Sequence, residues 1–537
     1  MSTETRPIHR SLRLRADVPE PGVIDLTPFA GPALWTLIAG LCVLVGGATL
    51  DLDAVDAKLG LTALEPLQPF GQVAGNWDPS VWVGSILPSR LWEAVGRMRA
   101  SAAAVRWPAA IAGLIIGLVL SRTGTRTSGS RAGILVGLCW FGTVGLIDHS
   151  AATGLDLILG LGVVGCLTRI LLRGSDTVAG LCLAWAFLAG GWPPVLLVVL
   201  ATIVIGRQGA GLSLRLLAPP VLAAIGWSVW CLRSAPPDIW GAALALPITQ
   251  SSAWDLAPGV FLIGFPWTPF TLAAASRSVR AGWDSRARSL VKGWAQITGA
   301  SLLIGTLIPG MAAPSRVAAL AGIAVIAGYV FESLWTSAGS LSRTARNLLR
   351  LALAGAIVPW CIGVFLYAGY LSFAVSYYRL TAVVCLALAG AAGLLAIACL
   401  RNVPGKAVLA CVALVVVGLK LGHWGYYVPE WNYRESQGPW GRAIGQWVPP
   451  NRTIYVTHEW QPDLCFAIGR PVRRIVNPAL LASMPGISPK FVLLHEAEFE
   501  HWPEQSGKLV KVASFLDEFG SGRVLARTEG DFSWKQR

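Results

Sequence analysis

The chain has 537 residues, of which 54% are hydrophobic and only 13% are charged, and its formal net charge is +14. A soluble globular protein carries roughly 25% charged residues, so the composition excludes an ordinary soluble protein. Most of the apolar blocks are about 17–22 residues long, close to the roughly 20 residues that span the hydrocarbon core of a bilayer. The sequence therefore predicts a polytopic α-helical membrane protein, integral to the cell inner or plasma membrane.

About thirteen apolar blocks follow one another along the chain, each a candidate membrane helix. They lie near residues 32–50, 107–121, 132–148, 154–172, 177–190, 192–206, 216–233, 258–275, 293–309, 314–335, 350–372, 380–400 and 406–423. Whether residues 177–206 form one span or two stays open, because "AGGWPP" (Ala189–Pro194) is compatible with a kink in one span as well as with a loop between two.

The positive charges of the loops predict the orientation. Basic residues gather before the first block and in alternate short loops, whereas the intervening short loops hold almost none. Cytoplasmic loops are enriched in Lys and Arg, so residues 1–31 are expected to form a basic cytoplasmic N-terminus. An odd number of spans then places the C-terminal region outside the cytoplasm. Because the charge is explained by topology, nucleic acid is not expected as a partner.

Two outer segments are too long to be simple connections. Residues 32–423 are expected to form the transmembrane domain, which includes a first extracytoplasmic loop at 51–106. Within this loop, "SRLWEAVGRMRA" (Ser89–Ala100) has the amphipathic character of a helix that lies in the membrane interface.

The second long segment, residues 424–537, is expected to form a small extracytoplasmic α/β domain. It alternates helical or loop stretches with short β-like runs, "TIYVT" (Thr453–Thr457) and "KFVLLHE" (Lys490–Glu496). Its length lies within the usual range for one domain.

Three carboxylates stand where the first apolar block ends. Asp51, Asp53 and Asp56 lie in "GATLDLDAVDAKLG" (Gly47–Gly60). Ionisable residues near membrane depth are costly and are usually paired or functional. A carboxylate at this place can take a proton from an acceptor hydroxyl or amine as it attacks, which is the work of a general base. Interfacial Asp residues also cap helices, and this alternative stays open, above all for Asp56.

A second group of polar residues, in "IDHSAATGLD" (Ile147–Asp156), holds Asp148, His149 and Asp156. Carboxylates from two consecutive outer loops can face one cavity, so Asp156 and Asp148 are further candidate catalytic residues. His149 is a candidate substrate-binding residue, although a hydrogen-bonding or capping role competes with that interpretation.

Basic and aromatic side chains supply the other candidates for substrate binding. Arg316 and Arg379, at the edges of outer loops, are positioned to hold a lipid phosphate through charge-assisted hydrogen bonds. Trp92 can line a sugar or lipid site, or belong to an interfacial aromatic belt. Arg106 is expected to extend to the membrane interface. The ten cysteines show no CxxC spacing, so they are interpreted as small buried hydrophobes, and no metal or cofactor is predicted.

Several short motifs occur along the chain in a recognisable order. They are "LDLDAVD", "LPSRLWEAV", "VRWPAAIAGLIIGLVL", "HSAATGLDLILGL", "AGGWPPVLL", "FPWTPF", and a C-terminal run of "WGRAIGQWVPPNRTIYV", "LCFAIGRPVRRI" and "FVLLHE". In this order the whole chain resembles the GT-C superfamily of membrane glycosyltransferases, specifically the bacterial branch related to protein O-mannosyltransferases and the lipid A aminoarabinose transferase.

The resemblance implies an activity and its residues. Such family members take a sugar from a polyprenyl-phosphate donor on the outer face and transfer it, with inversion, to a protein or lipid acceptor. The implied partners are therefore this donor, the acceptor and membrane lipids. The acidic residue of the first outer loop is the expected catalytic base, a role that falls on Asp53, with Asp51 next. The acid of the second loop maps onto Asp156, with Asp148 close behind.

Two other functions stay open. Family members usually carry an Asp-Glu pair where this chain has Asp53 and Ala54. One alternative is therefore a catalytically silent member that binds polyprenyl-phosphate lipids or serves as an assembly subunit. The other is a lipid or glycan transporter, a class that often shows two similar halves with broken helices; the sequence has no evident internal repeat of that kind.

Overall fold

The fold is known from a computed structural model. It describes residues 27–44, 102–149, 155–206, 213–234, 256–308, 310–337, 341–374, 376–401, 405–434, 436–450, 452–457, 462–470, 472–475, 478, 481, 489–503, 506–516 and 522–529. The helices and helical turns are α1 (Thr27–Leu44), α4 (Ala102–Ser128), α5 (Ser130–Phe141), α6 (Val144–His149), α7 (Leu155–Leu171), α8 (Asp176–Gly190), α9 (Trp192–Ile205), α10 (Leu214–Ser234), α12 (Leu256–Ile263), α13 (Thr268–Thr271), η4 (Leu272–Ala275), α14 (Arg277–Ala281), α15 (Ser285–Leu307), α16 (Ala312–Ser337), α17 (Arg343–Ala374), η6 (Ser376–Tyr378), α18 (Arg379–Arg401), α19 (Gly405–Gly422), η7 (His423–Tyr427), α20 (Val428–Arg434), α21 (Gly438–Trp447), α22 (Pro462–Ile468) and α24 (Glu496–Glu500). The strands are β1 (Ile454–Val456), β2 (Val472–Arg474), β3 (Phe491–His495), β4 (Leu509–Leu516) and β5 (Gly522–Thr528).

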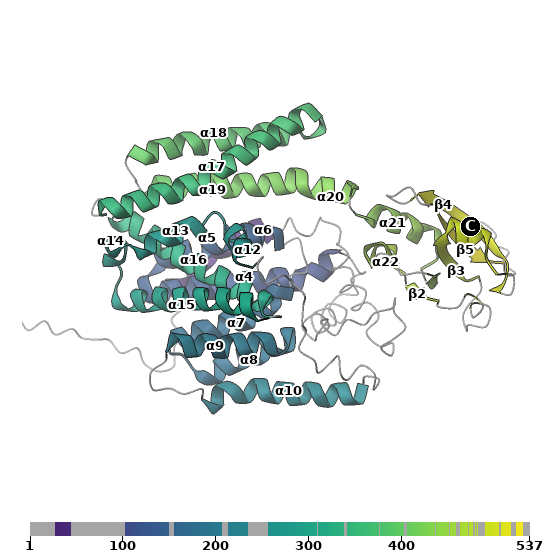
Figure 1. Cartoon of the computed structure of the whole chain (residues 1–537), viewed down its shortest axis with the longest axis horizontal. Coiled ribbons are helices and arrows are strands. Elements are labelled where there is room, and N and C mark those ends of the chain that lie inside the picture. The colour runs from purple at the N-terminus through teal and green to yellow at the C-terminus, as the bar shows by residue number, and fades with distance from the viewer. Residues whose placement is uncertain are drawn as a thin grey trace, which may run out of the picture.

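Long apolar helices make up most of the described chain, as the sequence predicts (Figure 1). Within the described ranges, α4, α16, α17, α18 and the run from α19 to α20 are each long and apolar enough to cross a membrane. The pair α12 and α13 passes the same test together, with a bend of 100° between its two parts. The other apolar helices are shorter, so the predicted number of thirteen spans stays a prediction.

Two of the expected single spans are broken. The block at 132–148 divides into α5 and α6 at Gly142 and Thr143. Thr143 starts α6 as a cap, because its Oγ1 accepts a hydrogen bond from the Leu146 amide at 3.3 Å. The bend between α12 and α13 packs into this break: the Val144 amide donates to the Phe265 carbonyl at 2.8 Å.

Glycine permits this close approach. A Cβ on Gly142 would lie 2.6 Å from Cζ2 of Trp267, so only glycine leaves room for the indole there. At the junction that the sequence left open, Gly191 separates α8 from α9 and adopts a φ of 71°. This left-handed region is readily accessible to glycine, and the two helices therefore end and restart at that residue.

One continuous apolar core joins the helices from α4 to α19. Its largest fully buried side chains include Trp140, Trp294, Tyr329 and Phe331. Small residues let the backbones of neighbouring helices approach, which is the usual way in which membrane helices pack. On α16, for example, a Cβ on Gly328 would lie 2.6 Å from Cγ2 of Val136 on α5.

The C-terminal residues form a five-stranded mixed sheet in the order β2-β1-β3-β5-β4. Strand β1 runs parallel to β2 and β3, whereas β5 pairs antiparallel with β3 and β4. Helices α21 and α22 cover one face through residues such as Ile444 and Leu464. The strands predicted at 453–457 and 490–496 are present as β1 and β3.

The helical run α19–η7–α20 leads from the bundle to the sheet, which lies beyond the end of α20 (Figure 1). The boundary predicted between residues 423 and 424 falls inside this run. Helices α21, α22 and α24 and the five strands together are the C-terminal unit. The domain limits and the side of the membrane on which the sheet lies stay predictions.

Candidate functional site

The residues predicted for the first outer loop lie outside the described part of the chain. These residues are Asp51, Asp53 and Trp92, together with Asp56. Asp148 and His149 are the last two residues of α6, and their side chains are likewise not described. The structure does place Asp156, Arg316 and Arg379.

Asp156 and Arg316 form an ion pair. Nη1 of Arg316 donates a hydrogen bond to Oδ2 of Asp156 at 3.2 Å. The side chains are 20% exposed for Asp156 and 32% exposed for Arg316, so the pair is partly shielded and partly accessible. Two of the residues that the sequence singled out, one as an acid and one as a phosphate ligand, therefore lie together.

The helix ends explain how this pair is held. Asp156 lies in the first turn of α7, where the positive end of the helix dipole favours a carboxylate. Arg316 lies near the start of α16, where the same dipole disfavours a cation. The Asp156 carboxylate offsets that unfavourable position, so the two residues stabilise each other across the α7–α16 contact.

Gly160 sets the distance between α7 and α16. A Cβ on Gly160 would collide with Cγ1 of Val317, the neighbour of Arg316. On the other side of Arg316 in the chain, Ser315 is fully buried, and a Cβ on Gly305 of α15 would lie 2.6 Å from its Cβ. Both chain neighbours of Arg316, Ser315 and Val317, are therefore closely packed against neighbouring helices.

Arg106 corrects one expectation from the sequence. It was expected to extend to the membrane interface, but it is 3% exposed near the start of α4. Hydropathy alone does not say which face of a helix points into the bundle. Because its side chain is buried, Arg106 is an internal polar residue of the bundle. A buried guanidinium of this kind needs compensating partners.

Arg379 is exposed at the first residue of α18, and α18 packs against α17 and α19. Arg316, by contrast, lies on α16 against α7. No described contact brings these two arginines together, so the structure unites Arg316 with Asp156 and not with Arg379.

A second polar cluster, which sequence reasoning missed, lies beside Arg379. Oη of Tyr378 donates to Oε2 of Glu430 at 3.0 Å, and Glu430 also pairs with Arg434 one turn later on α20. The ring of Tyr426 lies 4.9 Å from that of Tyr378 in an edge-on arrangement. A signal was present in the sequence, since Glu430 and Arg434 have the i, i+4 spacing of a helical ion pair.

The Asp156–Arg316 pair has a clear chemical capacity. A guanidinium carries five N–H donors in a planar fork that matches phosphate, and Asp156 engages one of its nitrogens. Among the residues described, no other partner occupies this guanidinium. Its remaining donors can therefore bind an anion while Asp156 fixes its orientation. Within the same part of the chain, no group of three or more His, Cys, Asp or Glu residues could hold a metal ion.

Comparison with known proteins addresses the fold. No protein-family model matches the chain, and no curated protein matches it. ArnT from Cupriavidus metallidurans in the apo state matches with a TM-score of 0.67 and 15% identity, over 92% of this chain and 97% of ArnT. The structure of ArnT bound to undecaprenyl phosphate matches with a TM-score of 0.67, 16% identity and the same coverage.

A third match, the archaeal oligosaccharyltransferase AglB from Archaeoglobus fulgidus in complex with an inhibitory peptide and a dolichol-phosphate, has a TM-score of 0.41 and 12% identity, over 95% of this chain and 76% of AglB. That similarity is too low to carry an argument. The match to ArnT, in contrast, extends over nearly the whole of both chains.

The described fold is therefore like that of a member of the GT-C superfamily. That member is ArnT, the lipid A aminoarabinose transferase. The resemblance predicted from the order of the motifs is confirmed at the level of the fold. At 15–16% identity, the similarity concerns the fold alone, and the activity needs its own argument.

Proposed function

We propose that this protein is an inverting glycosyltransferase. It moves a sugar from a polyprenyl-phosphate-linked donor to a protein, lipid or glycan acceptor on the extracytoplasmic face of the membrane. The observation that carries the proposal is the Asp156–Arg316 pair, which presents an oriented guanidinium on a GT-C-type fold. ArnT, with the same fold, has been seen bound to undecaprenyl phosphate, which supports this class of donor.

In the proposed reaction, an acceptor oxygen or nitrogen attacks C1 of the donor sugar. The bond from C1 to the phosphate oxygen breaks, and its electron pair leaves with the polyprenyl phosphate. Arg316 stabilises the charge on the departing phosphate through its free N–H donors. Asp53 takes the proton from the acceptor as general base, with Asp51 as the second candidate for this role.

Asp156 acts through Arg316 in this proposal. Its carboxylate holds the guanidinium in place, so that the donors face the phosphate before the sugar arrives. Preorganised donors are worth more than mobile ones, because they need no reorganisation during the reaction. Asp148 and His149, at the end of α6, are proposed to complete the acceptor side of the site, and Arg379 and Trp92 to contact the donor lipid or sugar.

The test measures sugar transfer in membranes that contain the protein and a polyprenyl-phosphate sugar. Asp53→Asn removes the base while preserving size, and it is expected to lower the rate of transfer by about 10²–10⁴-fold. Asp56→Asn is the matched control, since a capping role is the main alternative for Asp56 among the three carboxylates, and it should leave the rate nearly unchanged.

The alternatives give different results in the same experiment. If sugar transfer persists in both Asp53→Asn and Asp51→Asn, neither residue is the general base and the proposed assignment is wrong. A catalytically silent protein would bind polyprenyl phosphate but show no transfer in its natural form. A transporter would move the lipid across the bilayer without forming a new glycosidic bond.

A further inference from the structure

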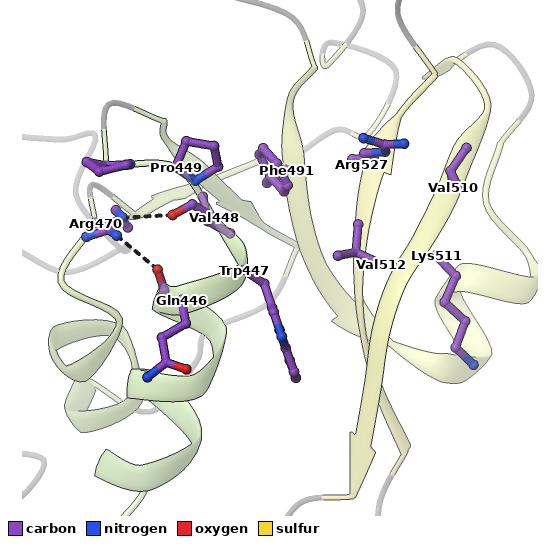
Figure 2. A pocket seen from close by; sticks show the side chains of 12 residues that line it. Gln446, Trp447, Val448, Pro449, Arg470, Phe491, Val510, Lys511, Val512 and Arg527 are labelled. Atoms are coloured by element: carbon purple, nitrogen blue, oxygen red, sulfur yellow. Dashed lines mark hydrogen bonds between the residues drawn. The ribbon is translucent and has the colours of Figure 1, made fainter. Parts of the chain in front are cut away.

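A pocket of about 740 Å³ opens in the C-terminal unit, away from the ion pair of the bundle. Figure 2 shows it between the end of α21, on one side, and strands β3, β5 and β4, on the other. The side chains that define it are Trp447 and Pro449 on the helical side, and Phe491, Val512 and Arg527 on the sheet.

The register of the sheet builds one wall. Phe491 of β3 pairs with Arg527 of β5, which in turn pairs with Val510 of β4. These three residues therefore form a row on the face of the sheet that α21 covers only in part. The β4 strand is irregular between Lys511 and Ala513, and a bulge of this kind redirects side chains at a sheet edge. In Figure 2, Val512 faces Trp447 across the pocket.

The opposite wall is held rigid by Arg470. Its Nε donates to the Val448 carbonyl at 3.1 Å, and its Nη2 donates to the Gly445 carbonyl at 2.9 Å. These are carbonyls at the end of α21, which have no partner within the helix. Two prolines, Pro449 and Pro450, follow and restrict the backbone further. The pocket is therefore preformed, a property that lowers the entropic cost of binding.

Large apolar surfaces remain open in this pocket. Trp447 is 44% exposed and Val512 is 38% exposed, so both offer apolar surface at the pocket. A flat indole next to an aliphatic side chain offers a surface for the less polar face of a ring. The walls thus fit a ring-shaped group that has both an apolar face and polar edges.

The charge of the pocket is positive. None of its lining residues is acidic. Lys511 pairs with Glu496 at 3.3 Å and points away from the pocket in Figure 2, and Arg470 is committed to the carbonyls of α21. Arg527 is different: within the described part of the chain its guanidinium has no hydrogen-bond or ion-pair partner. One cation is therefore left for a ligand.

We propose that this pocket binds an acidic sugar residue of a glycan, with the ring against Trp447 and Val512 and its anionic group on Arg527. The shared chemistry is a sugar ring that carries one carboxylate or one phosphate, because an arginine fork accepts either anion. A purely apolar ligand would leave Arg527 without a counter-charge. The binding of this sugar does not depend on the transfer reaction proposed above, and it is measured in the absence of that reaction.

The experiment is isothermal titration calorimetry on the full-length protein in detergent. The probes are an oligogalacturonate, a hexose phosphate, a neutral oligosaccharide of matched length and an oligoglutamate peptide. At least one acidic sugar is expected to bind about 10-fold or more tightly than the neutral sugar, and its affinity should fall as salt is added. The acidic sugar that binds identifies whether the anionic group is a carboxylate or a phosphate.

Two variants and a control test the residues. Arg527→Gln is expected to weaken binding of the acidic sugar by about 10- to 100-fold, the effect of losing a charge-assisted hydrogen bond. Trp447→Ala should weaken binding too, whereas Trp447→Phe should retain part of it because a ring remains. Lys508→Gln is the matched control, since it removes one charge from the same unit at a side chain paired with Glu529, and it should change nothing.

Several outcomes overturn the proposal. Equal affinity for acidic and neutral sugars removes the role of Arg527, as does an Arg527→Gln variant that binds like the parent. If Lys508→Gln and Arg527→Gln lower the affinity for the acidic sugar equally, the sugar is attracted by the net charge of the protein alone. Binding of the oligoglutamate as tightly as the sugar, with the same dependence on Arg527, would make the pocket a peptide site. Thermal unfolding of each variant shows whether it is folded. If Trp447→Ala does not fold, Trp447→Phe still tests the role of the indole ring.

Discussion

Arg316 donates a hydrogen bond to Asp156 at 3.2 Å and so connects α16 to α7 across 160 positions of the chain. The pair lies at the start of both helices, and it leaves most of the arginine fork unoccupied by described residues. A carboxylate that orients an arginine has a characteristic signature: its removal matters only while the arginine is present.

A double-mutant cycle tests this relationship. Arg316→Gln is expected to weaken binding of a short-chain polyprenyl phosphate by about 10- to 100-fold, because charge-assisted hydrogen bonds to the phosphate are lost. Asp156→Asn should cause a smaller loss, and the double variant should bind no worse than Arg316→Gln. Titration calorimetry gives the three affinities.

Arg286→Gln serves as the control for this cycle, since Arg286 is exposed on α15 and its loss should leave lipid affinity unchanged. Losses that simply add in the double variant would show that Asp156 and Arg316 act independently. The role proposed for Asp156 would then be wrong.

Gly160 gives a second prediction, on stability. Gly160→Ala places a methyl group against Val317, and overpacking of this kind typically costs about 1–3 kcal/mol. The variant should therefore unfold at a lower temperature in detergent and bind polyprenyl phosphate more weakly, since α16 must move with Arg316. Gly299→Ala is the matched control: it lies on α15 with open space around it, and it should be neutral or slightly stabilising.

A rescue variant sharpens the Gly160 test. Val317→Ala removes the methyl groups that the new Cβ would meet, so Gly160→Ala combined with Val317→Ala should recover most of the lipid affinity lost in Gly160→Ala. If Gly160→Ala is as stable as Gly299→Ala, the α7–α16 contact is looser than the structure indicates.

Part of this architecture was predictable from local sequence. Helices such as α16 and α18 follow from the length of their apolar runs, because a bilayer requires that length. The strands β1 and β3 follow from short β-branched and aromatic runs. The break at Gly142–Thr143 was not predictable, since both flanks are apolar and the break exists to receive Trp267, which is distant in sequence.

The sequence was enough to select the residues of the candidate site, but not to predict which of them are in contact. Asp156 and Arg316 were both selected as outer-loop ionisable residues, yet their contact depends on how α7 packs against α16. Arg106 was misplaced because hydropathy gives the depth of a residue and not the face of the helix. Glu430 was missed because a helix was not expected to continue past residue 423, where η7 and α20 extend α19.

The orientation in the membrane provides a third prediction. Ser514 on β4 and Ser285 at the start of α15 are both exposed, and they lie in segments predicted on opposite sides. Ser514→Cys should react with a membrane-impermeant maleimide in intact cells. Ser285→Cys should react only after the membrane is opened.

The parent protein is the background control for this labelling. The eight described native cysteines are buried or half-buried. In the C-terminal unit, burial raises the pKa of the Cys465 thiol to about 12, so the reactive thiolate is scarce there. Labelling of Ser285→Cys but not Ser514→Cys in intact cells would invert the predicted topology.

Tyr378 gives a prediction that depends on pH. Burial, followed by the hydrogen bond to Glu430, raises the pKa of Tyr378 to about 12, from an ordinary value near 10. Because the pKa is higher in the folded protein, the neutral phenol is the form that the fold favours. Its contribution to stability is therefore fully present below about pH 10 and is lost as the pH rises from about 10 to about 12.

Tyr378→Phe removes the hydroxyl and should lower stability by about 1–3 kcal/mol below pH 10, the usual effect of losing a hydrogen bond to a charged group. As the pH rises above 10, the difference between parent and variant should shrink, because the parent loses the same contribution. Tyr377→Phe is the control, since Tyr377 is 84% exposed and its hydroxyl should matter little. Thermal unfolding followed by tryptophan fluorescence between pH 8 and pH 11.5 measures all three proteins. A difference that stays constant up to pH 11.5, or one equally large for Tyr377→Phe, would show that the Tyr378–Glu430 hydrogen bond does not stabilise the contact between η6 and α20.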